Sequence, residues 1–240
     1  VTVTINGTND APVISGQATG EVTDGGSTST TGQLSKTDVD VNDTHTWSVS
    51  NDGKGKYGTF TVDQTGKWTY NLDGANTDVK GLKTGESITE TFTVYVDDGK
   101  GGKTPETITV TINGTDDGAV ITPSKPGDDK GTVKEDEIST ATGKLDVVDP
   151  DKGEAVFKPQ TDFKGEHGTF SIDANGKWTY TLDDTDPEVQ ALGAKDFLTE
   201  KFTVTTADGT TGTVTITING TNDKPTITGQ AAGDVTEDKV

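Results

Sequence analysis

The sequence predicts an all-β protein that contains two tandem antiparallel β-sandwich domains in an elongated arrangement. Three near-copies of one phrase carry this prediction: VTVTINGTND from Val1, ITVTINGTDD from Ile108 and VTITINGTND from Val214. Their first residues are 107 and 106 positions apart, which is one ordinary domain length. A second phrase supports this period, because GTFTVDQTGKWTYNLD from Gly58 and GTFSIDANGKWTYTLD from Gly168 are identical at eleven of sixteen positions.

The repeated phrases divide the chain into two complete units and two partial ones. We expect residues 1–10 to be the last strand of a preceding repeat, 11–117 and 118–223 to be two β-sandwich repeats, and 224–240 to start a following repeat. The linker at 117–121 is too short to act as a flexible tether. With no signal peptide and no apolar run long enough to span a membrane, the sequence reads as a piece of a longer tandem array.

A period-two pattern predicts the individual strands. Hydrophobic residues make up only 28% of the chain, so disorder is an alternative. Residues 59–62, 68–72 and 92–96 nevertheless alternate apolar side chains with Thr, as strands with one buried face do. Hairpin turns are expected at 63–66 and 173–176, terminal strands at 108–113 and 214–219, and one helical turn at 187–192.

The charge of the chain favours cations as partners. Forty acidic residues face twenty basic ones, all Lys, for a net charge of -20. Such a surface excludes nucleic acid and anionic membranes as partners, and we expect no direct membrane insertion. Since the chain has no Cys, a small β domain of this kind relies on metal ions or on neighbouring repeats for additional stability.

Acidic residues recur at four turns of each unit and are the candidate metal ligands. Carboxylate and Asn oxygens, without His or Cys, favour Ca²⁺ over Zn²⁺. The candidates of the first unit are Asn9, Asp10, Asp24, Asp38, Asp40 and Asp98. Those of the second unit are Asp116, Asp117, Glu135, Asp136, Asp149, Asp151 and Asp208. The third copy of the phrase adds Asn222 and Asp223, and the restarted strand adds Glu237.

We expect most of these groups to gather at the pole of each sandwich that faces the preceding unit. Two carboxylates about 5 Å apart repel by roughly 1 kcal/mol in water, and a bound dication removes that repulsion. The alternative is that Asp, Asn and Gly only form turns, which is the interpretation we favour for Asp63 and Asp173. An EF-hand loop starting at Asp38 fails, because its sixth position is Asp43 and its twelfth is Val49.

Several phrases resemble the VCBS-type, cadherin-like repeats of giant RTX-type bacterial surface adhesins. They are the Gly-Lys-Trp-Thr-Tyr phrase of both units, VVDPDKGE at 147–154, DDGKGG at 97–102 and NGTNDAP at 6–12. The resemblance implies immunoglobulin-like or cadherin-like sandwiches in a calcium-loaded extender region. It also implies type I secretion, an extracellular place on a bacterial cell surface, and a role in attachment or biofilm formation, with glycan or host contacts made by other regions.

Cadherins bind Ca²⁺ through an Asn-Asp linker pair and an Asp-x-Asp pair in the following domain. By similarity, Asn9-Asp10 and Asp116-Asp117 match the first pair, while Asp38/Asp40 and Asp149/Asp151 match the second. The chain departs from the pattern where Asp116 replaces Asn and where the first unit has no Asp-Pro-Asp.

Two other classes of function compete with a calcium-stiffened spacer. In a binding module, one sandwich face would recognise a glycan or a host protein, and the divergent segments 77–86 and 184–195 are where such a site would lie. Trp68 and Trp178 could serve as sugar platforms, yet their strand parity with Tyr70 and Tyr180 favours the core. An enzyme is not expected, because His45 and His167 occupy non-equivalent positions without nearby triad or zinc partners.

Overall fold

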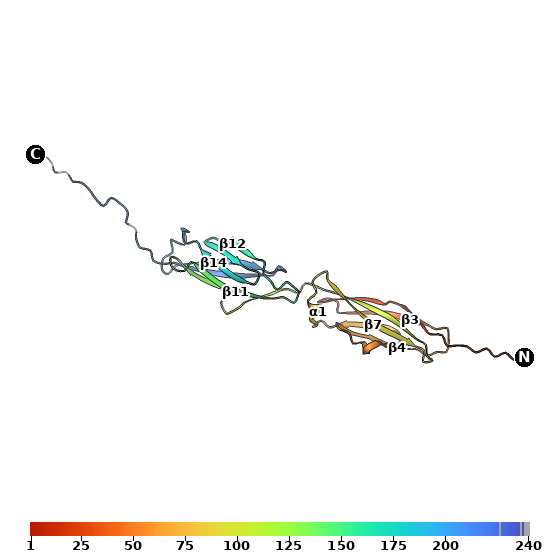
Figure 1. Cartoon of the computed structure of the whole chain (residues 1–240). Helices are drawn as coiled ribbons and strands as arrows, with labels where there is room; N and C mark the ends of the chain where they lie inside the picture. Colours follow the sequence, from red (N-terminus) through yellow and green to blue (C-terminus); the bar gives the residue numbers. More distant parts are fainter. Residues whose placement is uncertain (226, 236, 238–240) are drawn as a thin grey trace. The chain divides into compact units, whose positions relative to one another are not determined.

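The computed structural model describes residues 1–225, 227–235 and 237. Its internal contacts divide the chain into two units: Val1–Val120 with Val148–Ala155, and Ile121–Val147 with Val156–Val240. Each unit is all-β (Figure 1). No helix in the described part of the chain has the length and apolar character that crossing a membrane would require.

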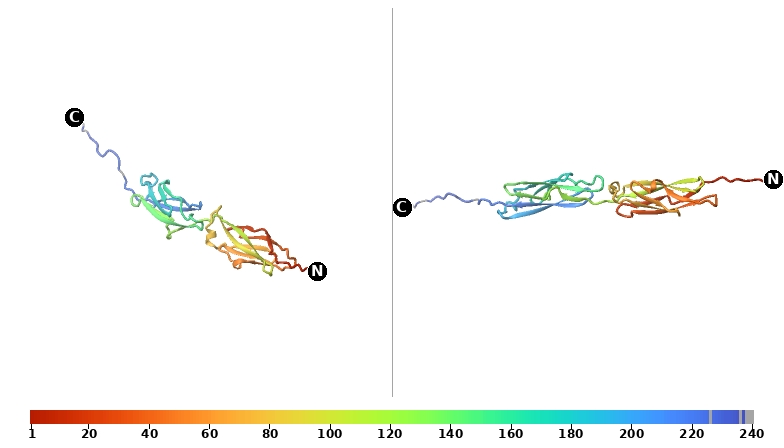
Figure 2. Two further views of the ribbon diagram at one scale, coloured as in Figure 1. Left: turned by 45° about the vertical axis from the view of Figure 1, so that its right-hand side comes forward. Right: turned by 90° about the horizontal axis from the view of Figure 1, so that it is seen from below.

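The first unit is a sandwich of two four-stranded sheets, and each unit forms two layers of strands in both views of Figure 2. One sheet has the order β1-β3-β6-β5, formed by Val13–Gly16, Ser29–Thr37, Lys67–Leu72 and Gly58–Val62. The other has the order β2-β8-β7-β4, formed by Thr19–Thr23, Lys103–Asn113, Ser87–Asp97 and Thr46–Val49. A 3-10 turn, η1 (Ser50–Gly53), follows β4, and a short helix, α1 (Thr77–Lys80), precedes β7.

The second unit repeats this plan with a different distribution of strands. Its five-stranded sheet has the order β12-β13-β14-β11-β9, formed by Gln160–Lys164, Gly168–Ile172, Lys177–Leu182, Thr140–Val148 and Val120–Pro123. Its three-stranded sheet has the order β10-β16-β15, formed by Lys130–Lys134, Thr211–Asn219 and Phe197–Thr205. The prediction of two tandem β-sandwich domains is therefore confirmed.

Each unit contains a parallel strand pair, which departs from the purely antiparallel sandwich expected. β2 runs parallel to β8, with Thr23 opposite Asn113, and β10 runs parallel to β16, with Lys134 opposite Asn219. The early strand of each unit therefore ends at the same pole as the last strand. An alternating burial pattern does not reveal this, because parallel and antiparallel strands expose their faces with the same period of two.

Aromatic side chains fill the centre of each sandwich. Trp68 and Tyr70 are fully buried, and Phe60 stacks on Phe92 with ring centroids 4.8 Å apart. The second unit has the same arrangement, formed by Trp178, Tyr180, Phe170 and Phe202. Burial of each such ring stabilises the fold by about 1.5–3 kcal/mol. Because neither of these Trp rings reaches solvent, the interpretation of both as core residues is confirmed, and sugar stacking on them is excluded.

The two units differ at the strand that follows the acidic turn. In the first unit, β4 pairs with β7 through Val49, and Gly53 then takes a φ of 69°. The equivalent positions of the second unit hold Pro159 and Phe163. A Cβ at Gly53 would lie 1.8 Å from the Phe60 carbonyl oxygen, so a Phe cannot adopt this conformation. The segment instead forms β12 on the opposite sheet, and β15 becomes an edge strand.

Residues 1–10, expected as the last strand of a preceding repeat, form no strand in this structure and are exposed. The same phrase at 108–113 lies within β8, where it pairs with β2 and β7 of its own unit. In the second unit, 187–191 forms hydrogen-bonded turns in place of a helix, while α1 occupies the equivalent position of the first unit.

Candidate metal centre

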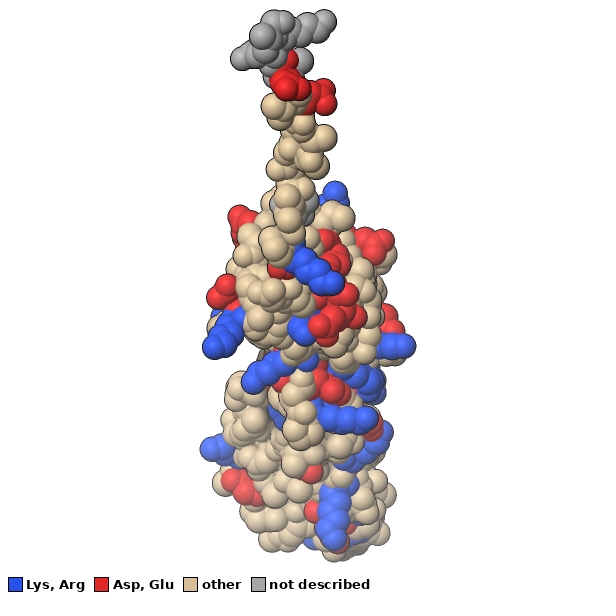
Figure 3. Space-filling model, turned by 90° about the vertical axis from the view of Figure 1, so that its left-hand side faces the viewer, with Lys and Arg blue, Asp and Glu red and all other residues tan. Residues whose placement is uncertain are grey.

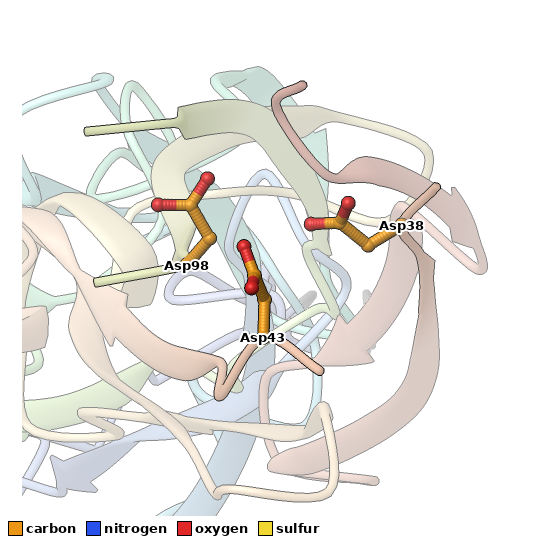
Figure 4. Close-up of side chains that lie close together, drawn as sticks. All are labelled: Asp38, Asp43 and Asp98. Atoms are coloured by element: carbon orange, nitrogen blue, oxygen red, sulfur yellow. The ribbon is translucent and has the colours of Figure 1, made fainter. Parts of the chain in front are cut away.

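Three carboxylates converge at the pole of the first unit where β3 and β7 end. Asp38 follows β3, Asp43 lies in the turn that leads to β4, and Asp98 follows β7. One oxygen of each lies within 4.8 Å of the others, and Figure 4 shows the three carboxylates pointing toward one another. We call these residues the first cluster.

Hydrogen bonds hold two members of the first cluster in the ionised form. The Asn9 side-chain amide donates to Asp98 Oδ2 at 2.9 Å and the Lys100 amide donates to Asp98 Oδ1 at 2.7 Å; both lower the pKa of Asp98. At Asp38, the Asp40 amide at 2.9 Å and His45 Nε2 at 2.8 Å lower the carboxyl pKa in the same way. The ionised carboxylate is the form that binds a metal ion.

Asp43 is the member that the sequence reasoning did not select. Its side chain is only 1% exposed and pairs with Lys100, but its Oδ2 is buried and accepts no hydrogen bond. A buried carboxylate oxygen without a donor destabilises the fold unless a cation satisfies it. The spacing could have identified this residue, because Asp38 and Asp43 are separated by the same five positions as Asp149 and Glu154.

The second cluster consists of Asp116, Asp151 and Glu154, each with one oxygen within 4.8 Å of the others. Asp116 follows β8, whereas Asp151 and Glu154 come from Val148–Ala155, which belongs to the first unit by its contacts. The Asp117 amide donates to Asp151 Oδ2 at 2.7 Å. Asp151 Oδ1 and Glu154 Oε2 are buried and accept no hydrogen bond.

Two lysines adjoin the second cluster. Lys80 Nζ lies 3.3 Å from Asp24 Oδ2 and 3.5 Å from Asp117 Oδ2, and Lys83 Nζ lies 2.7 Å from Glu154 Oε1. Burial opposes the charge of Lys80, but its ion pairs with Asp24 and Asp117 together outweigh burial and raise the pKa of Lys80. The hydrogen bond to Glu154 raises the pKa of Lys83. Both lysines therefore stay charged at neutral pH.

The expected grouping is wrong for Asp24, Glu135 and Asp136, which lie at the pole where the last strand of their unit ends and not at the pole where its first strand begins. The Asp24 amide donates to the Asn113 carbonyl at 2.9 Å, at the end of β8. The Glu135 amide donates to the Asn219 carbonyl at 2.9 Å, at the end of β16. These residues lie at the terminal pole of their own unit because β2 and β10 run parallel to the last strands.

The remaining candidates lie outside the two clusters. The Asp10 amide donates a hydrogen bond to Asp40 Oδ2 at 2.9 Å, and the Asp151 amide donates to Asp149 Oδ1 at 2.8 Å. These hydrogen bonds hold the backbone next to each cluster. Asp208 accepts the Thr210 amide and hydroxyl within the turn before β16. The other described candidates are solvent-exposed: Asp136, Asn222, Asp223 and Glu237.

The donor sets fit a hard dication. Ca²⁺ binds oxygens at 2.3–2.6 Å, so two ligand atoms of one ion lie at most about 5 Å apart. Both clusters satisfy that limit, with only carboxylate oxygens. His45 contacts Asp38 from outside the first cluster, and His167 lies 3.4 Å from Asp186. Figure 3 shows Lys and acidic side chains interspersed over the face that it displays, without a continuous basic surface.

Known proteins resemble this chain in sequence and in fold. The family described as the bacterial cadherin-like domain matches residues 9–114 and 122–220. The calcium-binding lectin RapA2 of Rhizobium johnstonii is 30% identical over 190 residues, and the match covers 70% of this chain and 75% of that protein.

Two solved structures share the fold. Mouse cadherin-23 EC22-24 matches with a TM-score of 0.50 and 18% identity over 89% of this chain and 67% of its own. Drosophila N-cadherin EC1-4 also gives a TM-score of 0.50, with 15% identity over 89% of this chain and 50% of its own. Because the family match covers most of both sandwiches, the chain belongs to the bacterial cadherin-like domains.

Proposed function

We propose that this chain is a non-catalytic, calcium-binding spacer of a bacterial cell-surface adhesin, in which Ca²⁺ at the acidic poles stiffens the tandem domains. One observation carries the proposal. In both clusters, buried carboxylate oxygens accept no hydrogen bond, namely Asp43 Oδ2, Asp151 Oδ1 and Glu154 Oε2. An ion bound among three converging carboxylates satisfies these oxygens and removes their mutual repulsion.

The position of the second cluster links ion binding to stiffness. Asp116 lies in the connection between β8 and β9, and Asp151 and Glu154 lie in the loop between β11 and β12. Neither segment belongs to a strand, so its backbone is held by few ladder hydrogen bonds. An ion that binds both segments restrains the connection between one repeat and the next. The partners of each repeat are then its neighbours in the chain.

An extracellular place on a bacterial surface suits this chemistry. Extracellular modules bind Ca²⁺ with affinities of about 10⁻⁴–10⁻³ M, which carboxylate clusters near the surface provide. Membership in a bacterial cadherin-like family and likeness to a calcium-binding lectin support this placement. The phrases shared with VCBS-type repeats support an RTX-type adhesin, secreted by a type I system, as the parent. Attachment or biofilm formation is the role that we propose for the parent.

Small-angle X-ray scattering with CaCl₂ or with EDTA tests the proposal. We expect chelation to broaden the distance distribution of the chain, because its carboxylates then repel without an ion. Asp151→Asn, which keeps the shape of the side chain, should reproduce part of that change in calcium. The proposal is wrong if isothermal titration detects no Ca²⁺ binding, or if the scattering curves with CaCl₂ and EDTA coincide.

Glycan recognition is a second candidate function, favoured by one feature of the second unit. Phe163 is 55% exposed at the rim of a cleft of about 650 Å³, and its ring meets Phe202 edge-on at 6.3 Å. Lys164, Lys201 and Thr199 also line this cleft. The first unit has Gly53 at the equivalent position, so the aromatic platform is specific to one unit. The naming of RapA2 as a lectin adds support.

A glycan array followed by NMR titration tests this second candidate. We expect a sugar that binds the cleft to shift the amide signals of residues 160–166 and 197–203. Phe163→Ala should abolish the binding, whereas Val41→Ala, at another exposed apolar residue, should leave it unchanged. The absence of any hit, or a hit that survives Phe163→Ala, removes this candidate.

A further inference from the structure

We infer that Lys80 is an internal cation that competes with calcium at the terminal pole of the first unit. This inference rests on the proposed function, because it assumes that the pole binds Ca²⁺. Lys80 Nζ lies 3.3 Å from Asp24 Oδ2 and 3.5 Å from Asp117 Oδ2. Its ammonium group therefore lies between two of the carboxylates that a calcium ion at this pole would approach.

The Lys80 ammonium group compensates the negative charge of the buried Asp24 carboxylate. The Asp24 side chain is 1% exposed, and the structure gives its Oδ2 no hydrogen-bond donor, so the neighbouring ammonium supplies its counter-charge. Its other oxygen accepts the Gly25 amide at 2.9 Å. A buried carboxylate without a cation is strongly unfavourable. Lys80 thus stabilises this pole when calcium is absent.

The fold holds Lys80 in place from both sides. Asn76 caps α1 by accepting the Asp78 amide at 2.9 Å, and Val79 is fully buried next to Lys80. The helix therefore directs the Lys80 stem toward the end of β8. Its target, Asp117, is tied to the second cluster through the 2.7 Å hydrogen bond from its amide to Asp151 Oδ2. A charge at Lys80 consequently acts on the whole cluster.

The second unit lacks this lysine at the equivalent pole. The phrase Asp-Val-Lys at 78–80 corresponds to Glu-Val-Gln at 188–190, so Gln190 replaces Lys80. Glu135, the counterpart of Asp24, is completely buried, and its Oε1 accepts no hydrogen bond. The two units thus neutralise this buried carboxylate differently. In the first unit the Lys80 ammonium lies beside Asp24, whereas in the second unit Glu135 Oε1 is left for an external cation.

A calcium ion at the first of these poles must displace the Lys80 ammonium or bear its repulsion. A unit charge about 5 Å from a dication opposes binding by an amount that corresponds to roughly tenfold in affinity, even in a water-like dielectric. Lys80→Gln, which installs the residue found in the second unit, should therefore lower the calcium concentration at half-saturation by about tenfold. In EDTA the same variant should melt at a lower temperature than the wild type, because Asp24 loses its counter-charge.

NMR calcium titrations of the whole chain test the inference, with the amides of Asp117 and Lys100 reporting on the two clusters. Lys80→Arg keeps the charge and should keep the wild-type midpoint at Asp117. Lys130→Gln removes an equal charge from the exposed face of β10 and should change neither midpoint. A Lys80→Gln chain that folds only when calcium is added also supports the inference.

The outcomes separate the inference from the proposed function. If calcium shifts neither amide of the wild type, the proposed function fails. If calcium shifts the Asp117 amide with the same midpoint in the wild type and in Lys80→Gln, the proposed function stands and Lys80 is not a competitor. A lower melting temperature of Lys80→Gln in calcium as well as in EDTA, without tighter binding, likewise overturns the inference and leaves Lys80 as an ordinary ion pair.

Discussion

Asp151→Asn should stabilise the first unit in EDTA and destabilise it in calcium. Asp151 is 1% exposed, and one of its oxygens lies within 4.8 Å of oxygens of Asp116 and Glu154. Asparagine has nearly the same shape, and its carbonyl oxygen can still accept the Asp117 amide that now reaches Asp151 Oδ2 at 2.7 Å. The substitution therefore removes a charge while keeping the packing and one hydrogen bond.

The magnitude follows from the distances. Two unit charges at 4.8 Å repel by about 0.9 kcal/mol in water and by about 3–4 kcal/mol at an effective dielectric of 20. Lys83, 2.7 Å from Glu154, offsets part of the repulsion. We therefore expect a gain of about 1–2 kcal/mol in EDTA, which raises the melting temperature by roughly 5 °C per kcal/mol for a unit of this size. In saturating calcium, a tenfold weaker site loses about 1.4 kcal/mol of stabilisation.

Differential scanning calorimetry in EDTA and in about 10 mM CaCl₂ measures both effects. That calcium concentration is roughly tenfold above the weakest dissociation constant of about 10⁻³ M expected for an extracellular calcium site. Asp63→Asn is the matched control, because Asp63 accepts hydrogen bonds from Thr65 and Lys67 within its own hairpin turn. It should lower the melting temperature similarly with and without calcium. If Asp151→Asn destabilises the chain equally under both conditions, its carboxylate is structural and the electrostatic reasoning about the cluster is wrong.

Three further predictions concern the sandwich itself. Tyr70→Phe removes the 2.8 Å hydroxyl hydrogen bond to the buried Glu90 carboxylate, and urea denaturation should show a loss of about 1–3 kcal/mol in the free energy of unfolding. Gly53→Ala sets a Cβ against the Phe60 carbonyl, and we expect a loss of about 2 kcal/mol or more by the same assay. Hydrogen bonds from the Thr65 hydroxyl and amide lower the pKa of Asp63 below 3.8, so its contribution to stability is present at neutral pH and lost as the pH falls through its folded pKa. Chemical denaturation between about pH 5 and pH 2, a window that runs from above the ordinary Asp pKa to well below it, should show a smaller loss for Asp63→Asn than for the wild type.

The sandwich core was predictable because burial follows strand parity. Trp68 and Tyr70 are two positions apart on β6, so one face of that strand is buried completely, while Lys67 and Asn71 are exposed. The alternation therefore identifies the strand and its buried face in a chain with few apolar residues. It does not identify the neighbouring strands, because pairing depends on contacts between residues that are distant in the sequence.

The place of β12 illustrates that limit, although two residues carried a signal. Pro159 takes the place of Val49, and Phe163 cannot adopt the φ of 69° found at Gly53. Each substitution is visible in the sequence when the two units are aligned at Gly58 and Gly168. Their consequence, a strand that joins the opposite sheet, depends on which edge offers free hydrogen-bonding groups.

The sequence predicted that acidic turn residues would converge, but it predicted only some of the residues that do. The Asp-x-Asp pairs of the sequence include Asp38 and Asp151. Asp43 and Glu154 each lie five positions after the first Asp of such a pair, a spacing that the Asp-x-Asp pattern does not include. Asp24 was placed at the wrong pole because the sequence does not show whether a strand runs parallel or antiparallel to its neighbour. That these residues bind calcium stays a prediction until an ion is measured there.

The repeated phrase INGTND has a physical reason at almost every position. Ile112 is fully buried, and a Cβ at Gly114 would lie 2.3 Å from the Leu82 carbonyl oxygen, so only glycine fits beneath this segment. The Thr115 hydroxyl donates to the Asp24 carbonyl at 3.1 Å, which joins the end of β8 to the end of β2. The phrase thus closes the sandwich and brings the chain directly to Asp116.

The copy in the second unit repeats these contacts with different chemistry. A Cβ at Gly220 would lie 2.4 Å from Leu192 Cβ, and the Thr221 amide donates to Glu135 Oε2 at 3.0 Å. Glu135 Oε1 is left buried without a hydrogen bond. One phrase therefore builds the same pole twice, and the residue at position 80 or 190, lysine or glutamine, decides whether that pole contains its own cation.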